Sequence, residues 1–184
     1  MRISPGRKDQ FLDMHCPQCA LVSSSGQMLG AGVGEEIDKI GCVIRMNNAA
    51  DAGPRSIRRS KSTAVTKEKI QYCDGVFQNE TGKNRMKTGA FLSTGFFTMI
   101  LALDMCDSIR VYGMIDENYC SRANHSVVPY HYYEKNRVDE CRMYRVHEHT
   151  QRGGHRFITE KSIYARWATR HKMEFKHPAW SPRG

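Results

Sequence analysis

Two histidines stand where an imidazole could transfer a proton. His131 precedes two tyrosines and a glutamate in PYHYYEKNR (129–137). His155 follows two glycines in GGHRFITEK (153–161) and lies five residues before Glu160. A loop histidine beside a helix end can act as a general base, and histidine and tyrosine can donate hydrogen bonds to a departing phosphate. The alternatives are a half-buried tyrosine-rich strand and a histidine that is merely exposed.

Two other stretches could bind an anion. Residues 19–38 (CALVSSSGQMLGAGVGEEID) run from an apolar segment through serines and glycines to acidic residues, an order that indicates strand, turn and helix start. Their glycines are spaced G-x-G-x-G, so a typical dinucleotide site is excluded, and a nucleotide site of another kind stays open. Ser93, Thr94 and Gly95 precede an apolar helix whose N-terminus could hold phosphate, although on this stretch alone an ordinary N-cap before a core helix is the better interpretation.

Metal chemistry has no obvious ligands in the sequence. D-x-D, H-E-x-x-H and G-x-x-x-x-G-K-[ST] are all missing. Cys16 and Cys19 form a C-x-x-C motif, but zinc would need a second pair of ligands with comparable spacing. A redox motif would lie at a helix start, whereas Cys19 opens a strand. We therefore expect no metal site and a structural disulfide for at least one of the two cysteines.

The cysteines and the N-terminus point to different compartments. Seven cysteines and two glycosylation sequons, at Asn79 and Asn124, are typical of the secretory pathway. The odd count leaves at least one thiol unpaired in a monomer. The first ten residues contain no apolar core and do not form a signal peptide, which favours the cytosol. No run of 18 apolar residues exists, so we expect no membrane span.

Apolar runs alternate between strand and helix patterns. Strands are predicted at 19–23, 42–46 and 109–114, and helices at 35–40, 66–80, 94–106 and 159–171, the last with Thr159 as its N-cap. This alternation predicts one α/β domain with a largely parallel sheet.

The chain carries a net charge of +9, which favours anionic partners, although an ordinary basic surface is equally compatible. Residues 49–64 contain four Arg or Lys and no apolar period, so we expect a solvated basic linker. Nucleic-acid binding is disfavoured because no aromatic residue stands between the basic ones to stack on bases.

Four segments occur in the order of the sialyl motifs, and the chain resembles the animal sialyltransferases. Residues 19–49 resemble the large motif, 89–114 the small motif, 131–134 (HYYE) the third motif and 155–160 (HRFITE) the very small motif. Three short stretches resemble the α-2,6 N-acetylgalactosaminide subgroup of this family: SSSGQMLG, CDGVF and ETGKNR. Within that subgroup, the chain resembles the members that modify sialylated glycolipids or O-glycans.

The resemblance implies a Rossmann-like sheet related to the A-type glycosyltransferases, no metal and no cofactor, and CMP-sialic acid as donor. His155 would be the base that deprotonates the acceptor hydroxyl for an inverting attack, and His131 would stabilise the departing phosphate. A disulfide would join Cys19 to Cys106. The implied substrate-binding residues are Ser24, Ser25, Gly26, Asn47, Ser93, Thr94, Gly95 and Tyr132.

The chain departs from the family in two respects. A cytoplasmic tail, a membrane anchor and a stem are missing, and after RMNNA a long stretch with acceptor contacts is replaced by the basic linker 49–64. Residues 1–184 are thus expected to form a single truncated catalytic domain with an incomplete sheet, which predicts exposed apolar faces and poor folding. The alternative is an inactive fragment that binds nucleotide or a full-length partner. The family implies the Golgi lumen, while the missing anchor and signal favour the cytosol.

Overall fold

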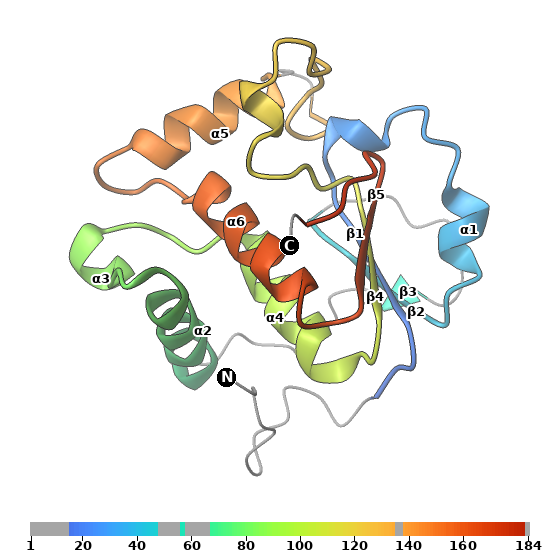
Figure 1. The fold of residues 1–184 in the computed structure, drawn as a ribbon, viewed down its shortest axis with the longest axis horizontal. Coiled ribbons are helices and arrows are strands. Elements are labelled where there is room, and N and C mark those ends of the chain that lie inside the picture. The colour runs from blue at the N-terminus through green and yellow to red at the C-terminus, as the bar shows by residue number, and fades with distance from the viewer. Residues whose placement is uncertain (1–14, 48–55, 58–66, 135–137, 183–184) are drawn as a thin grey trace.

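The computed structural model describes residues 15–47, 56–57, 67–134 and 138–182. Five parallel strands form one sheet in the order β3-β2-β1-β4-β5 (Figure 1). The strands are β1 (Cys19–Val22), β2 (Cys42–Arg45), β3 (Ser56–Ile57), β4 (Ile109–Tyr112) and β5 (Met173–Lys176). The predicted parallel α/β architecture is confirmed, and the three predicted strands correspond to β1, β2 and β4.

Two strands escape the sequence patterns. β3 lies inside the segment 49–64 and pairs with β2, so the linker prediction is wrong at residues 56–57, while the rest of that segment lies outside the described residues. β5 alternates charged residues with Phe175, which is buried against the ring of Trp180 at 3.8 Å between centroids. Its single buried residue is too weak a pattern to predict a strand, and pairing with β4 decides its conformation.

The helices are α1 (Gly34–Asp38), α2 (Lys67–Thr81), α3 (Arg85–Thr88), α4 (Thr94–Met105), α5 (Glu140–His149) and α6 (Phe157–Ala168), with 3₁₀ turns η1 (Gly26–Met28) and η2 (Tyr119–Ser121). The predictions for α1, α2 and α4 are confirmed, and α5 was not predicted. The N-cap prediction for Thr159 is wrong, because α6 begins at Phe157 after Arg156. Thr159 instead lies in the first turn, where its N–H and hydroxyl both donate to the Glu148 carboxylate.

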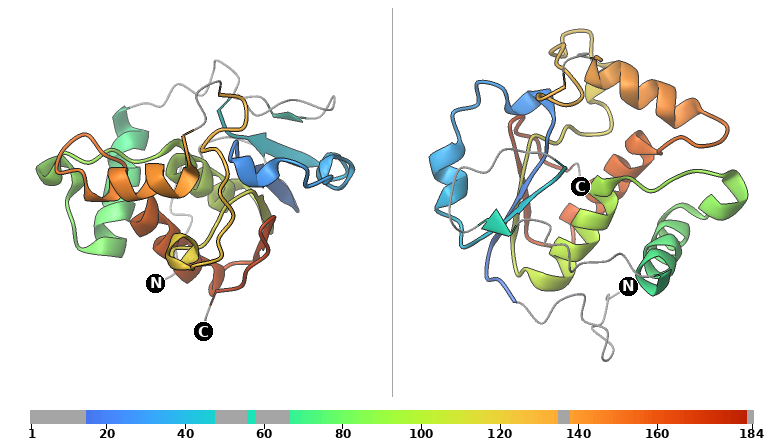
Figure 2. Two further views of the ribbon diagram at one scale, coloured as in Figure 1. Left: turned by 90° about the horizontal axis from the view of Figure 1, so that it is seen from above. Right: turned by 180° about the vertical axis from the view of Figure 1, so that it is seen from behind.

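The two faces of the sheet are covered unequally. Helices α4 and α6 pack on one face with α2 outside them, and the short α1 lies on the other (Figures 1 and 2). Side chains of β1 alternate accordingly: Leu21 joins the core under α4 and α6, and Ala20 joins the cluster under α1. No helix among the described residues has the length and apolar character needed to cross a membrane.

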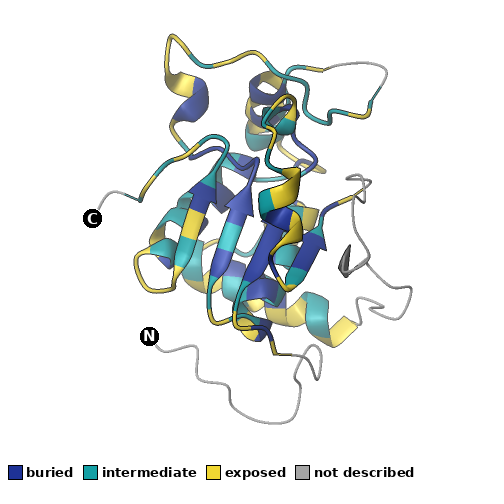
Figure 3. Cartoon of the chain, turned by 90° about the vertical axis from the view of Figure 1, so that its right-hand side faces the viewer, coloured by how far each residue is buried: buried dark blue, intermediate teal, exposed yellow. Residues whose placement is uncertain are grey.

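The face under α1 is closed by polar contacts at β4 and β5. Glu36 of α1 accepts hydrogen bonds from the Tyr112 hydroxyl and the Lys176 ammonium, both at 2.7 Å, and Arg110 pairs with Glu174 at 3.0 Å. The strands β1, β2, β4 and β5 expose no large hydrophobic side chain, and their central residues are largely buried (Figure 3). Exposed apolar side chains within the described residues lie on loops and helices instead.

Three disulfides cross-link the described chain. They join Cys16 to Cys42, Cys19 to Cys106, and Cys120 to Cys141. The second pair is the one that the family resemblance implies, and it ties the start of β1 to the end of α4. The one remaining cysteine of the seven, Cys73, is a buried free thiol, as the odd count predicts.

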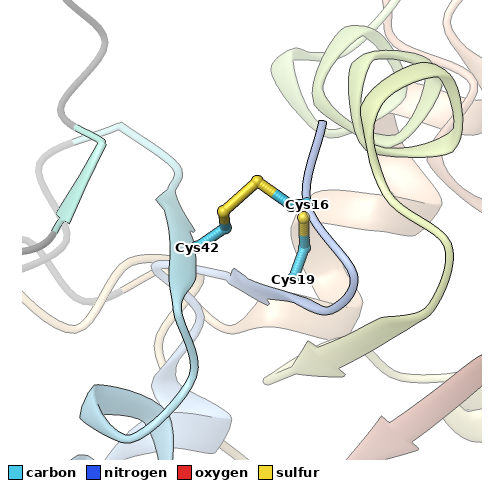
Figure 4. A group of neighbouring side chains, drawn as sticks. All are labelled: Cys16, Cys19 and Cys42. Atoms are coloured by element: carbon cyan, nitrogen blue, oxygen red, sulfur yellow. A yellow bond between two sulfur atoms is a disulfide. The ribbon is translucent and has the colours of Figure 1, made fainter. Parts of the chain in front are cut away.

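The sulfur atoms of Cys16, Cys19 and Cys42 lie within 4.8 Å of one another (Figure 4). Since each of them is in a disulfide, none is a thiolate that could bind a metal ion. This cluster therefore consists of two neighbouring disulfides at the amino-terminal ends of β1 and β2.

Candidate active site

A pocket lies at the carboxyl ends of β1, β2 and β4, next to the N-terminus of α4 and the start of α6. In parallel α/β sheets ligands bind at this edge, where neighbouring strands connect in opposite directions. β1 is such a point, because β2 follows on one side of it and β4 on the other. The residues proposed from the sequence that line the pocket are Ser24, Asn47, Ser93, Thr94, Gly95, His131 and His155.

Ser24 connects the first and third motifs. Its Oγ lies 2.8 Å from Nδ1 of His131 and accepts a hydrogen bond from the Asn47 side-chain amide at 3.1 Å. With the amide as its donor, the Ser24 hydroxyl can give its single hydrogen to Nδ1, which leaves the His131 proton on Nε2. Burial holds the pKa of His131 below its ordinary value, although the Glu134 carboxylate opposes this shift. In this tautomer the nitrogen that donates is Nε2, which lies 3.8 Å from the Glu134 carboxylate.

Asn47 reaches Ser24 from a left-handed backbone conformation, with φ of 53°. Asparagine tolerates this region better than most residues because its short polar side chain can bond locally. Only Met46 separates Asn47 from the end of β2, so the turn after the strand directs the amide back toward Ser24 at the end of β1.

His155 is held by a backbone carbonyl. Its Nδ1 lies 3.1 Å from the carbonyl oxygen of Phe91, which can only accept a hydrogen bond. The proton must therefore sit on Nδ1, and the lone pair of Nε2 is free to accept another proton. Burial lowers the pKa of His155, and the nearby His147 lowers it further, whereas the Phe91 carbonyl raises it. His155 is therefore a neutral imidazole at pH 7.

The loop before His155 depends on glycine. A Cβ built on Gly154 would lie 2.4 Å from the His147 carbonyl oxygen, so no larger residue fits. The carbonyl oxygen of Gly154 in turn accepts from the N–H of Phe91 at 3.0 Å. This close packing of two loops fixes the carbonyl that binds His155.

Ser93 begins α4 and is fixed by a buried carboxylate. Its Oγ accepts the N–H of Phe96 at 3.1 Å, while its own N–H donates to Glu160 at 2.8 Å and its hydroxyl donates to the other Glu160 oxygen. Burial raises the pKa of Glu160 to about 7, and the Ser93 hydrogen bonds oppose this rise. Glu160 thus orients the helix end, where the N–H groups of Thr94 and Gly95 precede the first intrahelical bonds. The sequence gives Glu160 only as the last residue of the very small motif.

Ser25, Gly26 and Tyr132 lie beside the pocket rather than in its wall. The Ser25 hydroxyl accepts from the N–H of Gln27 at 3.1 Å and caps η1. Gly26 approaches Pro129 so closely that an added Cβ would lie 2.5 Å from it, and its N–H donates to the Pro129 carbonyl at 2.8 Å. The backbone N–H of Tyr132 donates to the Ser24 carbonyl at 3.0 Å. The Tyr132 contact joins the third motif to the first, the Gly26 contact joins the first motif to the segment just before the third, and the Ser25 contact orders the turn inside the first motif.

The two asparagines of the sequons are exposed. Asn79 lies in the last turn of α2, and Asn124 in the loop after η2. Both positions are accessible to a large modification.

Part of the pocket wall is aromatic. The Tyr130 ring is tilted against His131 with 4.1 Å between ring centroids and against Phe157 with 5.7 Å, and Phe157 lies 5.0 Å from His155. One aromatic layer therefore supports both histidines. Tyr144 and Lys161 complete this side of the pocket from α5 and α6. Tyr144 was missed because α5 itself was not predicted. Phe157 lies inside the very small motif and Lys161 inside the helix predicted at 159–171, but neither was named as a site residue.

The arrangement suits transfer of a group from a phosphate leaving group to a hydroxyl. It offers a free imidazole lone pair, a second imidazole that donates, and a helix N-terminus with a positive partial charge. The Glu160 carboxylate, which lines the pocket, accepts a hydrogen bond from Ser93. The buried Glu140 carboxylate lies outside the pocket wall and accepts from the Gln27 amide at 3.0 Å and the Tyr144 hydroxyl at 2.8 Å. Among the described residues, the only group of three or more potential metal ligands is the disulfide cluster.

Comparison with known proteins is consistent with this chemistry. The model of glycosyltransferase family 29 (sialyltransferase) matches residues 3–55 and 51–172. A human α-N-acetyl-neuraminyl-2,3-β-galactosyl-1,3-N-acetyl-galactosaminide α-2,6-sialyltransferase is 42% identical over 227 residues, covering 90% of this chain and 75% of its own. Human α-N-acetylgalactosaminide α-2,6-sialyltransferase 3 is 38% identical over 232 residues, covering 92% and 76%.

A crystal structure of a mammalian sialyltransferase superposes with a TM-score of 0.49 at 19% identity, covering 97% of this chain and 75% of the other. The family match spans most of the sequence, and both sequence relatives exceed 30% identity over most of their length. The chain therefore belongs to glycosyltransferase family 29, the sialyltransferases, and is an enzyme of that family.

Proposed function

We propose that this chain transfers sialic acid from CMP-sialic acid, in α-2,6 linkage, to the N-acetylgalactosamine of an already sialylated glycolipid or O-glycan. The name of the human relative at 42% identity describes such an acceptor, and the second relative is named for N-acetylgalactosaminide. The observation that carries the proposal is the hydrogen bond from His155 Nδ1 to the Phe91 carbonyl, because it leaves Nε2 as a base in the pocket.

The reaction is a single displacement. Nε2 of His155 takes the proton of the acceptor hydroxyl, and the hydroxyl oxygen attacks the anomeric carbon of sialic acid. The bond from that carbon to the phosphate oxygen breaks, and CMP leaves with the electron pair, which inverts the configuration. His131 donates a hydrogen bond to the departing phosphate, and the N-terminus of α4 stabilises its charge. These groups neutralise the phosphate without a metal ion.

A second candidate is a nucleotide-binding form that does not transfer. The alignment with the first human relative spans 227 positions, more than the 184 residues of this chain, so the relative has residues without a counterpart here. The two stretches matched by the family model also meet at the basic segment, around residues 51–55. Both facts support a catalytic domain shortened where acceptor contacts are expected. Even with these residues missing, the hydrogen bonds from Tyr112 and Lys176 to Glu36 cover the sheet face under α1, which supports a folded chain.

One pair of measurements separates the two candidates. Calorimetry with CMP reports binding, and incubation with labelled CMP-sialic acid and a sialylated Gal–GalNAc acceptor reports transfer. We expect transfer that falls at least a hundredfold in His155→Ala. His149→Ala is the matched control, since His149 is exposed in the last turn of α5. CMP binding without transfer by the unmodified chain would favour the second candidate and contradict the first.

The compartment follows from the same proposal. Three disulfides among the described residues require an oxidising environment, which supports the Golgi lumen. Expression in a secretory host should yield the three bonds and, if the exposed Asn79 and Asn124 are used, a mass that falls on endoglycosidase treatment. Full activity of fully reduced protein would contradict this assignment.

A further inference from the structure

One lysine in the pocket wall is buried without a fixed partner. Lys161 follows Glu160 in α6, is 5% exposed, and lines the pocket together with Thr94 and Gly95. Within the part of the chain that the structure describes, its ammonium makes no hydrogen bond and no ion pair. Its close contact is the ring of Tyr144, with 4.0 Å from Nζ to the ring centroid.

The carboxylates around Lys161 are occupied by other donors. Glu160 receives the N–H and hydroxyl of Ser93. Glu140 receives the Gln27 amide and the Tyr144 hydroxyl. Glu148 receives the N–H groups of Ile158 and Thr159 and the Thr159 hydroxyl. All three carboxylates attract the lysine through space and oppose the fall in its pKa that burial causes, but none of them is its hydrogen-bond acceptor in the described part of the chain. The ammonium thus keeps its donors unused in a site where unpaired charge is costly.

The neighbouring helix end contributes positive potential to the same space. Thr94 and Gly95 are the first residues of α4, a helix of 12 residues, and their N–H groups have no intrahelical acceptor. The aligned peptide dipoles place a partial positive charge at this terminus. An unused ammonium and a helix N-terminus therefore border one pocket.

We propose that Lys161 and the N-terminus of α4 bind one oxyanion of the substrate, a phosphate or a carboxylate, with Lys161 supplying the full charge. This deepens the proposed function and rests on it for the ligand, since CMP-sialic acid carries both groups. It makes Lys161 a binding residue for the negative charge of the substrate, in addition to the residues of the four motifs.

The test measures calorimetric affinity for cytidine, CMP and free N-acetylneuraminic acid. The variants are Lys161→Met, which keeps the length of the side chain without its charge, and Lys161→Arg, which keeps the charge. Lys172→Met is the control, since Lys172 is exposed outside the pocket. We expect Lys161→Met to weaken binding of one anion by about ten- to a hundredfold, with cytidine unchanged and partial recovery in Lys161→Arg.

The two arms separate the two oxyanions. Loss of CMP affinity assigns the phosphate, and loss confined to N-acetylneuraminic acid assigns the carboxylate. Thermal melting serves as the second readout: removal of an unpaired buried ammonium should leave the melting temperature equal or higher, whereas removal of a structural cation would lower it.

Equal anion affinity in Lys161→Met, or an unmodified chain that binds neither anion, would overturn the inference. Equal weakening for cytidine together with a lower melting temperature would do so as well, by assigning Lys161 a structural role. Binding that depends on Lys161 in a chain that transfers no sialic acid would contradict the proposed function alone.

Discussion

Replacing Ser93 by alanine removes two hydrogen bonds at the start of α4. The Ser93 hydroxyl accepts the N–H of Phe96 as the N-cap and donates to the carboxylate of Glu160. Loss of a serine N-cap costs about 1 kcal/mol of unfolding free energy. Loss of a hydrogen bond to a buried carboxylate costs about 2 kcal/mol more. The expected destabilisation is about 3 kcal/mol, or about 10 °C in melting temperature for a chain of this length.

The loss should depend on pH because Glu160 titrates. Its pKa is raised from 4.5 to about 7 by burial, so the folded state holds the proton more tightly than the unfolded state. The stability of the unmodified protein therefore falls as pH rises from about 4.5 through about 7. Ser93→Ala raises this pKa further, because the lost hydroxyl hydrogen bond favours the ionised form, while the backbone N–H of residue 93 still donates to Glu160. The destabilisation should thus be about 1 kcal/mol larger at pH 8 than at pH 5.5.

Denaturant unfolding at pH 5.5 and pH 8, with the disulfides intact, measures both effects. Ser162→Ala is the matched control, since the Ser162 hydroxyl donates to the Thr159 carbonyl within α6 and accepts a long contact of 3.5 Å from the exposed Arg166 side chain. It should change stability by less than about 0.5 kcal/mol. A Ser93→Ala loss no greater than that of the control would refute the assigned cap. A loss that is equal at the two pH values would refute Glu160 as the charged partner.

Three further predictions concern the base, one glycine and the free thiol. The kcat/KM for transfer should fall on acidification with a midpoint below pH 6.5, because burial lowers the pKa of His155 and protonation removes the base; a midpoint above pH 6.5 would contradict this. Gly26→Ala should cost about 1–3 kcal/mol in denaturant unfolding, since the added Cβ meets Pro129 at 2.5 Å, and an unchanged midpoint would show that the loop can move apart. A thiol reagent at pH 8 should label no cysteine in the native chain and one after denaturation, because burial raises the pKa of Cys73 to about 12; rapid native labelling would exclude the buried position.

The predictions that the structure confirms came from patterns within single segments of the sequence or from the four motifs. Apolar runs at β1, β2 and β4 and the apolar helix after Ser93 predicted the parallel α/β sheet, because each pattern reflects burial of its own segment. The sequence did not predict α5 or β5, because these elements contain many charged residues and too few buried apolar ones to give a recognisable pattern. It also failed at the start of α6, where Thr159 satisfies the cap rule but bonds to Glu148 instead.

The sequence by itself determined the family, the main strands and helices, and seven of the residues that line the pocket. Only the tertiary structure decided what each of those residues does. Ser24 meets His131 across 107 positions of sequence, and Ser93 meets Glu160 across 67. The fold also left Lys161 buried with no hydrogen-bond acceptor among the described residues, and it brought three cysteines of two disulfides into one cluster. The physical reason is that hydrogen-bond partners, burial and pKa shifts arise between segments that packing brings together, and local patterns contain no information about those distances.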